Sequence, residues 1–308
     1  MNESRNQPPF LNTFRHHYRH RYGEEVGKVV LDPGLVCPHR LQAGGCIFCR
    51  PAGFSPAYLR RSDPVPLQLA RGKEALRRQG VRRYLVAFQQ ETPTALAPAQ
   101  LLDHAADAGA DPDCVGLILS TRPDAVPEGL ILALAASPWG RDKELAVELG
   151  VQSIHEQSLR WLNRGHDFAA VPAALKRLRQ LPCCQVGAHL ILGIPGEGPA
   201  EMAASLTRVC DLGLDYLKLH HLQVMAGTRL AAVHHSAPLP LFTAEDYLTL
   251  LAGLLARVPQ RVVLHRLWAT ARPALLLAPR WGQRPAALRR RLTDIMQHRG
   301  LAQGSALP

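Results

Sequence analysis

The sequence predicts an α/β fold, a partial TIM-like (β/α)6 barrel with parallel strands and a short C-terminal extension. Short apolar strands alternate with helices about six times along the chain, which is typical of a parallel sheet with crossover helices. The uniform handedness of such crossovers curls the sheet into an open or closed barrel. With 308 residues, of which 47% are hydrophobic and 20% charged, the chain can bury the core that this fold needs.

The expected elements follow one another in a regular order. Proline in a first helical turn and glycine after a last turn mark several helices, and runs rich in Val, Ile and Leu mark the strands. Strands are expected at 28–31, 83–88, 114–120, 145–151, 185–192 and 215–220, with one more at 261–265. Helices are expected at 15–22, 67–79, 98–108, 128–136, 155–163, 170–181, 199–212, 243–257 and 285–298.

Three regions are expected along the chain. Residues 1–25 are a basic N-terminal segment, which starts with a tail over residues 1–10. Residues 26–237 form the partial barrel, and residues 238–308 form a helical extension that completes the domain. Arginine, histidine and tyrosine alternate over residues 15–22, which fits either contact with phosphate or RNA or a solvated helix whose tyrosines pack inward. We favour the packed helix.

Charge and hydropathy restrict the partners and the compartment. The net charge of +11 suits an acidic partner, such as nucleic acid or an anionic metabolite. Apolar runs stay shorter than a membrane span, and the polar residues 1–11 lack the apolar core of a signal peptide. We therefore expect a cytoplasmic protein with no membrane partner. In that reducing compartment, clustered cysteines indicate metal or redox chemistry before disulfides.

The most informative stretch is the loop after the first strand. Cys37, Cys46 and Cys49 have the spacing C-x8-C-x2-C, and thiolates at this density are typical of a metal or an iron–sulfur cluster. A structural zinc ion needs a fourth protein ligand, for which His39 is the candidate. A four-iron cluster with three thiolates keeps one iron open. Because the loop follows a strand, we expect it at the C-terminal rim of the barrel, where barrel enzymes keep their chemistry.

Polar residues also follow the other apolar strands. Each of these segments alone is compatible with a simple turn. Buried polar groups are costly without a partner, however, so their recurrence at one rim indicates a ligand site. The segments are 89–92 (QQET), 120–124 (STRPD), Glu148 with 152–153 (QS) and 163–166 (NRGH), 193–197 (GIPGE), and 218–221 (KLHH).

Together these motifs resemble the radical S-adenosylmethionine (SAM) superfamily. More narrowly, the chain resembles the YhcC-like group, which is related to the radical SAM domain of the elongator catalytic subunit. The resemblance runs from about residue 20 to about residue 285, and its long first cysteine spacing differs from the commonest superfamily motif and matches this group. It is carried by the strings LDPGLVCPHRLQAGGCIFC, STRPD, ELGVQSIHEQSLRWLNRGHDF, AHLILGIPGE, LKLHHLQVMAGTRLA and VVLHRL.

The resemblance implies an enzyme that binds a [4Fe-4S] cluster and SAM and generates a 5′-deoxyadenosyl radical to modify a substrate. Cys37, Cys46 and Cys49 would ligate the cluster, and its open iron would take the amino and carboxylate groups of SAM. A reductant such as flavodoxin or ferredoxin would supply the electron. Similarity to the elongator subunit and the basic charge together favour RNA, such as tRNA, or another anionic molecule as the substrate.

The same resemblance implies the contacts to SAM. Phe48 occupies the aromatic position expected to touch the adenine, while Gln152 and Arg164 match residues that hydrogen-bond the ribose and the carboxylate. Glu91 stands where the family has a glycine-rich contact to the amino group, and it would accept from the ammonium. His189 replaces an acidic residue near the ribose. The strand end that packs on the adenine contributes Gly193, Pro195 and Gly196.

The sequence leaves alternative roles for some residues and one alternative function. The adjacent Cys183 and Cys184 fit a second cluster, a redox pair or small core residues, and we favour the core. We also interpret Cys114 and Cys210 as core residues. His220 and His221 end a strand, where one of them would face the substrate. The rival function is a non-catalytic RNA-binding protein with a structural zinc or iron–sulfur site, which has no use for the SAM-contact residues.

Overall fold

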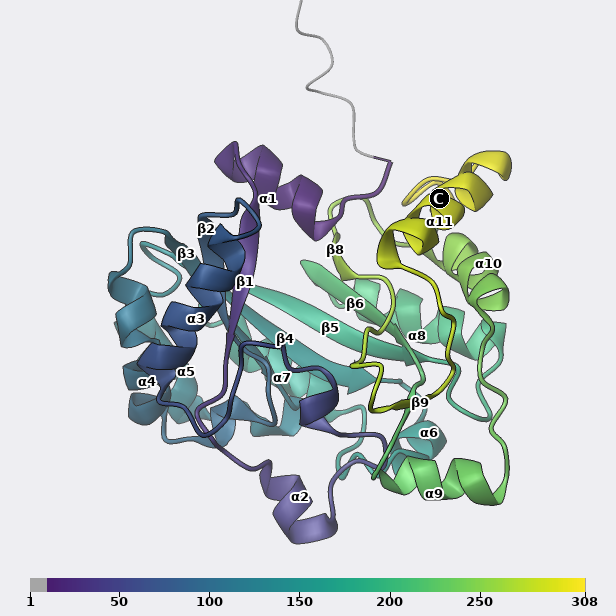
Figure 1. The fold of residues 1–308 in the computed structure, drawn as a ribbon, viewed down its shortest axis with the longest axis horizontal. Coiled ribbons are helices and arrows are strands. Elements are labelled where there is room, and N and C mark those ends of the chain that lie inside the picture. Colours follow the sequence, from purple (N-terminus) through teal and green to yellow (C-terminus); the bar gives the residue numbers. More distant parts are fainter. Residues whose placement is uncertain (1–9, 308) are drawn as a thin grey trace, which may run out of the picture.

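The computed structural model describes residues 10–307, in which a curled sheet is wrapped by helices (Figure 1). Except for Phe10, the expected N-terminal tail lies outside the described residues. The main sheet has seven strands in the order β1-β2-β3-β4-β5-β6-β8, and each neighbouring pair is parallel. The strands are β1 (Val26–Leu31), β2 (Arg83–Phe88), β3 (Cys114–Thr121), β4 (Glu144–Gln152), β5 (Cys184–Leu192), β6 (Tyr216–His221) and β8 (Val263–Arg266). The predicted α/β partial barrel is confirmed.

Helices cover the outer face of the sheet, where leucine and valine side chains form the main core. They are α3 (Val65–Arg77), α4 (Pro98–Ala110), α5 (Glu128–Ala136), α6 (Glu156–Trp161), α7 (Ala170–Leu178), α8 (Pro199–Asp211), α10 (Ala244–Leu255) and α11 (Pro285–His298). Single 3-10 turns are η2 (Pro51–Gly53), η3 (Pro93–Ala95) and η4 (Pro123–Ala125). Each expected helix is present, with ends that differ by a few residues.

Two helices and one small sheet were not expected from the sequence. Helix α2 (Pro38–Ala43) lies inside the cysteine loop, and α9 (Arg229–Ser236) lies at the same end of the molecule (Figure 1). Strands β7 (Val224–Met225) and β9 (Leu276–Ala278) form an antiparallel pair. These elements are too short to show a clear hydrophobic period, so only tertiary contacts specify them.

Helix α1 (Phe14–Tyr22) closes the opposite end of the barrel from α2 (Figure 1). Tyr18 is buried with inward-facing residues of six strands in a small apolar cluster. Its hydroxyl donates to Glu144 Oε2 at 3.1 Å, and the hydroxyl of Tyr22 donates to Glu144 Oε1 at 2.5 Å. The interpretation of residues 15–22 as a helix with inward-packed tyrosines is therefore confirmed.

The C-terminal part of the chain contributes directly to the sheet. Strand β8 pairs with β6, and β9 pairs with β7, so residues beyond 238 complete both sheets. Helix α10 packs against α11 on the outside. The boundaries 1–25, 26–237 and 238–308 stay a prediction. Within residues 10–307, no helix combines the length and the apolar character that a membrane crossing requires.

Candidate functional site

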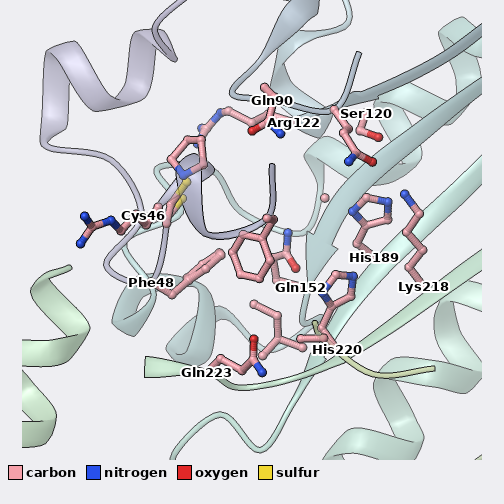
Figure 2. A pocket seen from close by; sticks show the side chains of 18 of the residues that line it. Cys46, Phe48, Gln90, Ser120, Arg122, Gln152, His189, Lys218, His220 and Gln223 are labelled. Atoms are coloured by element: carbon pink, nitrogen blue, oxygen red, sulfur yellow. The ribbon is translucent and has the colours of Figure 1, made fainter. Parts of the chain in front are cut away.

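A cavity opens at the carboxyl ends of the strands, where the sequence predicted a ligand site (Figure 2). The cysteine loop forms one side of it, and the ends of β2 to β6 and β8 form the rest. Its polar lining consists of Cys46, Cys49, Arg50, Gln89, Gln90, Glu91, Ser120, Thr121, Arg122, Gln152, Arg164, His189, Lys218, His220, His221, Gln223 and Arg266. The expected convergence of polar strand ends is therefore present, although the segment 193–197 does not line this cavity.

After α2, two glycines form a turn that directs the cysteine loop back toward the cavity. Gly44 and Gly45 have φ values of +70° and +71°, a left-handed conformation that glycine adopts without steric cost. The turn that they form brings Cys46 and Cys49 into the cavity lining. Phe48 lies in the lining beside Cys46, across the cavity from His189 (Figure 2).

Each sulfur atom of the three loop cysteines accepts one side-chain hydrogen bond. Such donors stabilise negative charge on sulfur and tune a metal site. The donor–sulfur pairs are Thr92 Oγ1 to Cys37 at 3.0 Å, Arg164 Nη1 to Cys46 at 3.0 Å and Arg40 Nη2 to Cys49 at 3.2 Å. Thr92 belongs to the polar segment 89–92, but its bond to a cysteine sulfur was not predicted, and neither was that of Arg40. Arg40 lies on α2 inside the cysteine loop, whereas Thr92 follows β2 and reaches Cys37 because the end of that strand meets the loop.

Glu91 connects the end of β2 to the cysteine loop. Its Oε2 accepts from the backbone N–H of Cys37 at 3.3 Å and from Arg40 Nη2 at 3.3 Å. The Glu91 backbone has a φ of +57°, which is unusual for a residue with a side chain and occurs often at functional sites. Burial raises the pKa of the Cys49 thiol to about 12, the charge of Cys46 adds to this, and Arg40 opposes it.

Arg164 sits between the end of β4 and the cysteine loop. Besides its bond to Cys46, its Nη2 donates to the carbonyl of Gly150 at 2.6 Å. Its Nε is buried and has no hydrogen-bond partner within residues 10–307. Arg164 therefore keeps one donor free beside the cysteine sulfur. Gln152, at the end of β4, lines the same cavity with a φ of +70°.

Asn163 anchors the cysteine loop through side-chain hydrogen bonds. Its Nδ2 donates to the carbonyls of Ala43 at 3.0 Å and Gly45 at 2.7 Å. Its own carbonyl lies 2.6 Å from Nε2 of His39, and a Cβ on Gly165 would collide with that imidazole. His39 is thus a packed residue bound to backbone. Among the residues that the structure describes, no group of three or more Cys, His, Asp or Glu side chains is found that could hold a metal ion, so the assignment of Cys37, Cys46 and Cys49 as ligands stays a prediction.

The glycine-rich strand end after β5 packs away from the cavity. The N–H of Gly193 donates to Met202 Sδ at 3.2 Å. A Cβ on Gly193 would stand 2.8 Å from the ring of Phe242, so close packing requires glycine here. Neither Pro195 nor Gly196 belongs to the cavity lining described above. Their contacts to an adenine stay a prediction.

A buried polar layer forms the inner end of the cavity. Glu148 is 1% exposed and accepts from Lys218 Nζ at 2.5 Å, Ser120 Oγ at 2.6 Å, His265 Nδ1 at 2.9 Å and His189 Nε2 at 3.2 Å. Burial opposes the ionised carboxylate, but the charge of Lys218 and the histidine hydrogen bonds hold the pKa of Glu148 well below its usual value. Burial lowers the pKa of His189 to about 4. The ion pair between Glu148 and Lys218 was not predicted.

The remaining cysteines and histidines differ in how deeply they are buried and in what they contact. Cys114 and Cys210 are buried core residues, as predicted, whereas Cys183 is exposed just before β5, so the core interpretation is wrong for that residue. His220 and His221 both line the cavity. His221 also stacks on Trp281 with a centroid separation of 3.8 Å.

The fold and the cysteine loop define a class of protein. The family model of the radical SAM superfamily matches residues 33–209, and that of the Radical_SAM C-terminal domain matches residues 214–294. The chain belongs to the radical SAM superfamily, a superfamily of enzymes.

The chain is also similar to particular relatives. It is 38% identical to protein YhcC of Escherichia coli K12 over 304 residues, which cover 96% of this chain and 95% of YhcC. It is 27% identical to a tRNA uridine(34) acetyltransferase of Methanocaldococcus infernus over 193 residues, covering 61% and 34% of the two chains. The structure of archaeal Methanocaldococcus infernus Elp3 matches with a TM-score of 0.69 and 18% identity, over 90% of this chain and 64% of that one. The resemblance to the YhcC-like group is therefore confirmed.

Proposed function

We propose that this protein is a radical SAM enzyme that uses a [4Fe-4S] cluster and SAM. The observation that carries the proposal is that the sulfurs of Cys37, Cys46 and Cys49 each accept a hydrogen bond from a side-chain donor, with Cys46 and Cys49 in the cavity lining. His39, the candidate fourth ligand for zinc, lies with its Nε2 2.6 Å from the carbonyl of Asn163 instead. Three thiols with supporting donors fit a cluster whose fourth iron is left for another ligand.

Side chains around the cysteine loop suit the parts of SAM. When bound, the cluster and SAM supply an electron and a 5′-deoxyadenosyl radical that abstracts a hydrogen atom from the substrate. Arg164 would hold the carboxylate through its free Nε, and Glu91 would accept from the ammonium. Gln152 would bond the ribose, and Phe48 would pack on the adenine. Further adenine contacts are proposed for the strand end with Gly193, Pro195 and Gly196.

The proposal implies an electron-donating partner and a reducing compartment. The cluster would receive its electron from a partner such as flavodoxin or ferredoxin, and the protein would work in the cytoplasm. The protein side chains would position SAM, tune the sulfurs and exclude water and oxygen from the cavity.

Anaerobic reconstitution with iron and sulfide tests the proposed function. We expect a brown protein with about four irons per chain. On reduction with dithionite it should cleave SAM to methionine and 5′-deoxyadenosine, because the three cysteines leave one iron for SAM. Iron and zinc analysis and chromatography of the nucleoside products measure this. A colourless protein that holds one zinc ion and leaves SAM intact would contradict the proposal and favour the non-catalytic RNA-binding alternative.

For the substrate, we propose RNA such as tRNA, or another anionic molecule. The support is the net charge of +11 and the partial similarity to a tRNA uridine(34) acetyltransferase.

Binding of tRNA at increasing salt concentration tests the RNA part of this proposal. We expect affinity to fall steeply with salt, because phosphate contacts release counterions. Filter binding or fluorescence anisotropy at several ionic strengths measures the slope. A flat dependence, or no binding, would leave the radical SAM assignment in place and direct the search to small anionic substrates.

A further inference from the structure

The cavity extends past the proposed SAM contacts to a wall of cationic side chains. Lys218 on β6 and Arg266 on β8 both line it, and they occupy paired positions in the register of these two strands. Like charges on paired positions of neighbouring strands repel each other. Two cations at this place therefore need negative charge nearby.

The protein supplies one carboxylate to this wall, that of Glu148, which pairs with Lys218. Glu148 Oε2 lies 2.5 Å from Lys218 Nζ. Glu148 acts on Arg266 through space, but within residues 10–307 no ion pair or hydrogen bond of the Arg266 guanidinium is found. Lys28, from β1, adds a third basic group to the layer, 3.3 Å from His265 Nδ1, and burial lowers its pKa well below the usual value. The layer thus holds more basic groups than carboxylates, and a guanidinium faces the cavity with its hydrogen-bond donors unused.

His220 adds a neutral donor to the same wall. Its side chain lines the cavity between those of Lys218 and Gln223 (Figure 2), and its Nε2 is buried without a hydrogen-bond partner among the described residues. Burial lowers the pKa of His220 well below its usual value, and the charge of Arg266 adds to this. Buried polar atoms in native proteins are nearly always paired, so the unpaired Nε2 leaves a hydrogen-bonding position at the cavity that a ligand atom can fill.

We propose that Arg266, Lys218 and His220 bind an oxyanion of the substrate, either a carboxylate or a phosphate group. The planar guanidinium matches both groups with two parallel hydrogen bonds. An anion here balances the excess basic charge and gives His220 a partner. The wall lies across the cavity from Cys46 and Phe48 (Figure 2), so the bound anion would hold the substrate opposite SAM. The assignment to a substrate rests on the proposed function, whereas the anion site itself does not.

Thermal unfolding of the full chain in matched salts tests the oxyanion site. Sodium phosphate and sodium acetate are compared with sodium chloride at equal ionic strength and pH, and the preferred anion distinguishes a phosphate from a carboxylate site. We expect the wild type to be stabilised in a saturable way, because an anion that binds only the folded state raises Tm. Arg266→Gln should weaken the apparent Kd about tenfold to a hundredfold, as expected for loss of charge-assisted hydrogen bonds. Arg290→Gln, the same change at an exposed position of α11, should leave the Kd unchanged.

Several outcomes would overturn the oxyanion site. These are no saturable stabilisation of the wild type by either anion, or equal Kd values for the wild type and Arg266→Gln. Should Arg266→Gln fail to fold, Arg266→Lys keeps the charge but loses the guanidinium fork. It must then bind more weakly than the wild type, and an unchanged Kd refutes the site. Iron content and SAM cleavage of the same samples separate the two proposals. Anion binding without a cluster contradicts only the proposed function, and a functional cluster without anion binding contradicts only this site.

Discussion

Replacing Cys46 by alanine is expected to abolish cluster binding and SAM cleavage while the barrel stays folded. The change removes one of three sulfurs, and two thiols do not hold a four-iron cluster in a stable way. The loop keeps its backbone anchors, since the N–H of Ile47 donates to the carbonyl of Leu162 at 3.0 Å, and the carbonyl of Ile47 accepts from Leu230 at 3.0 Å. The loss should therefore be confined to the site.

Iron content after anaerobic reconstitution and the yield of 5′-deoxyadenosine measure the Cys46→Ala effect, and circular dichroism with Tm checks the fold. Cys183→Ala is the matched control, because Cys183 is exposed and lies before β5. It should keep the iron content and the activity of the wild type. Survival of SAM cleavage in Cys46→Ala would refute the assignment of this ligand, and loss of iron in Cys183→Ala would point to a second metal-binding site.

Replacing Glu148 by glutamine is expected to lower the free energy of unfolding by about 3–5 kcal/mol, the usual cost of leaving a buried charge without its partner. Glu148 is 1% exposed, and Lys218 is 4% exposed. Glutamine keeps the size of the side chain but removes the charge that balances Lys218. It also disturbs the hydrogen bonds that Glu148 accepts from Ser120, His189 and His265. Together with Lys218, these residues belong to four other strands, so one substitution affects contacts across most of the sheet.

Urea denaturation, analysed as a two-state transition, measures the effect of Glu148→Gln. Glu128→Gln is the matched control, because Glu128 is exposed in the first turn of α5, and it should change stability by about 0.5 kcal/mol or less. The double variant Glu148→Gln with Lys218→Met removes both charges and should recover part of the loss. A single variant as stable as the wild type, or a double variant no better than the single, would show that this ion pair does not hold the barrel interior together.

The secondary structure was largely predictable because it depends on local pattern. Each of the six expected strands is present, and the additional strand at 261–265 appears as β8 (Val263–Arg266). Short helices such as α2 escaped prediction, because a few residues carry no measurable period and depend on their surroundings. The position of the cysteine loop at the rim was predictable as well, since a loop that follows a parallel strand must emerge at its carboxyl end.

The candidate site was predictable from the sequence where its reactive side chains lie close together in the chain. Three cysteines within one loop stand out without any structure. The donors to their sulfurs do not, because Thr92 follows β2 and Arg164 follows α6, and both contact the loop only after folding. The inward direction of Glu148 also follows from alternation along β4, but its partner on β6 depends on strand order and register.

The sequence by itself determined the class of the fold, the order of its strands and helices, and the cysteine loop that indicates a cluster. These features are local, so spacing and hydrophobic pattern are enough to recognise them. Only the tertiary structure decided that Arg40, Thr92 and Arg164 serve the three sulfurs, that Glu148 pairs with Lys218, and that Arg266 faces the cavity. The reason is physical: curling a parallel sheet brings together side chains that are up to about two hundred residues apart, and burial then determines which charges must be paired.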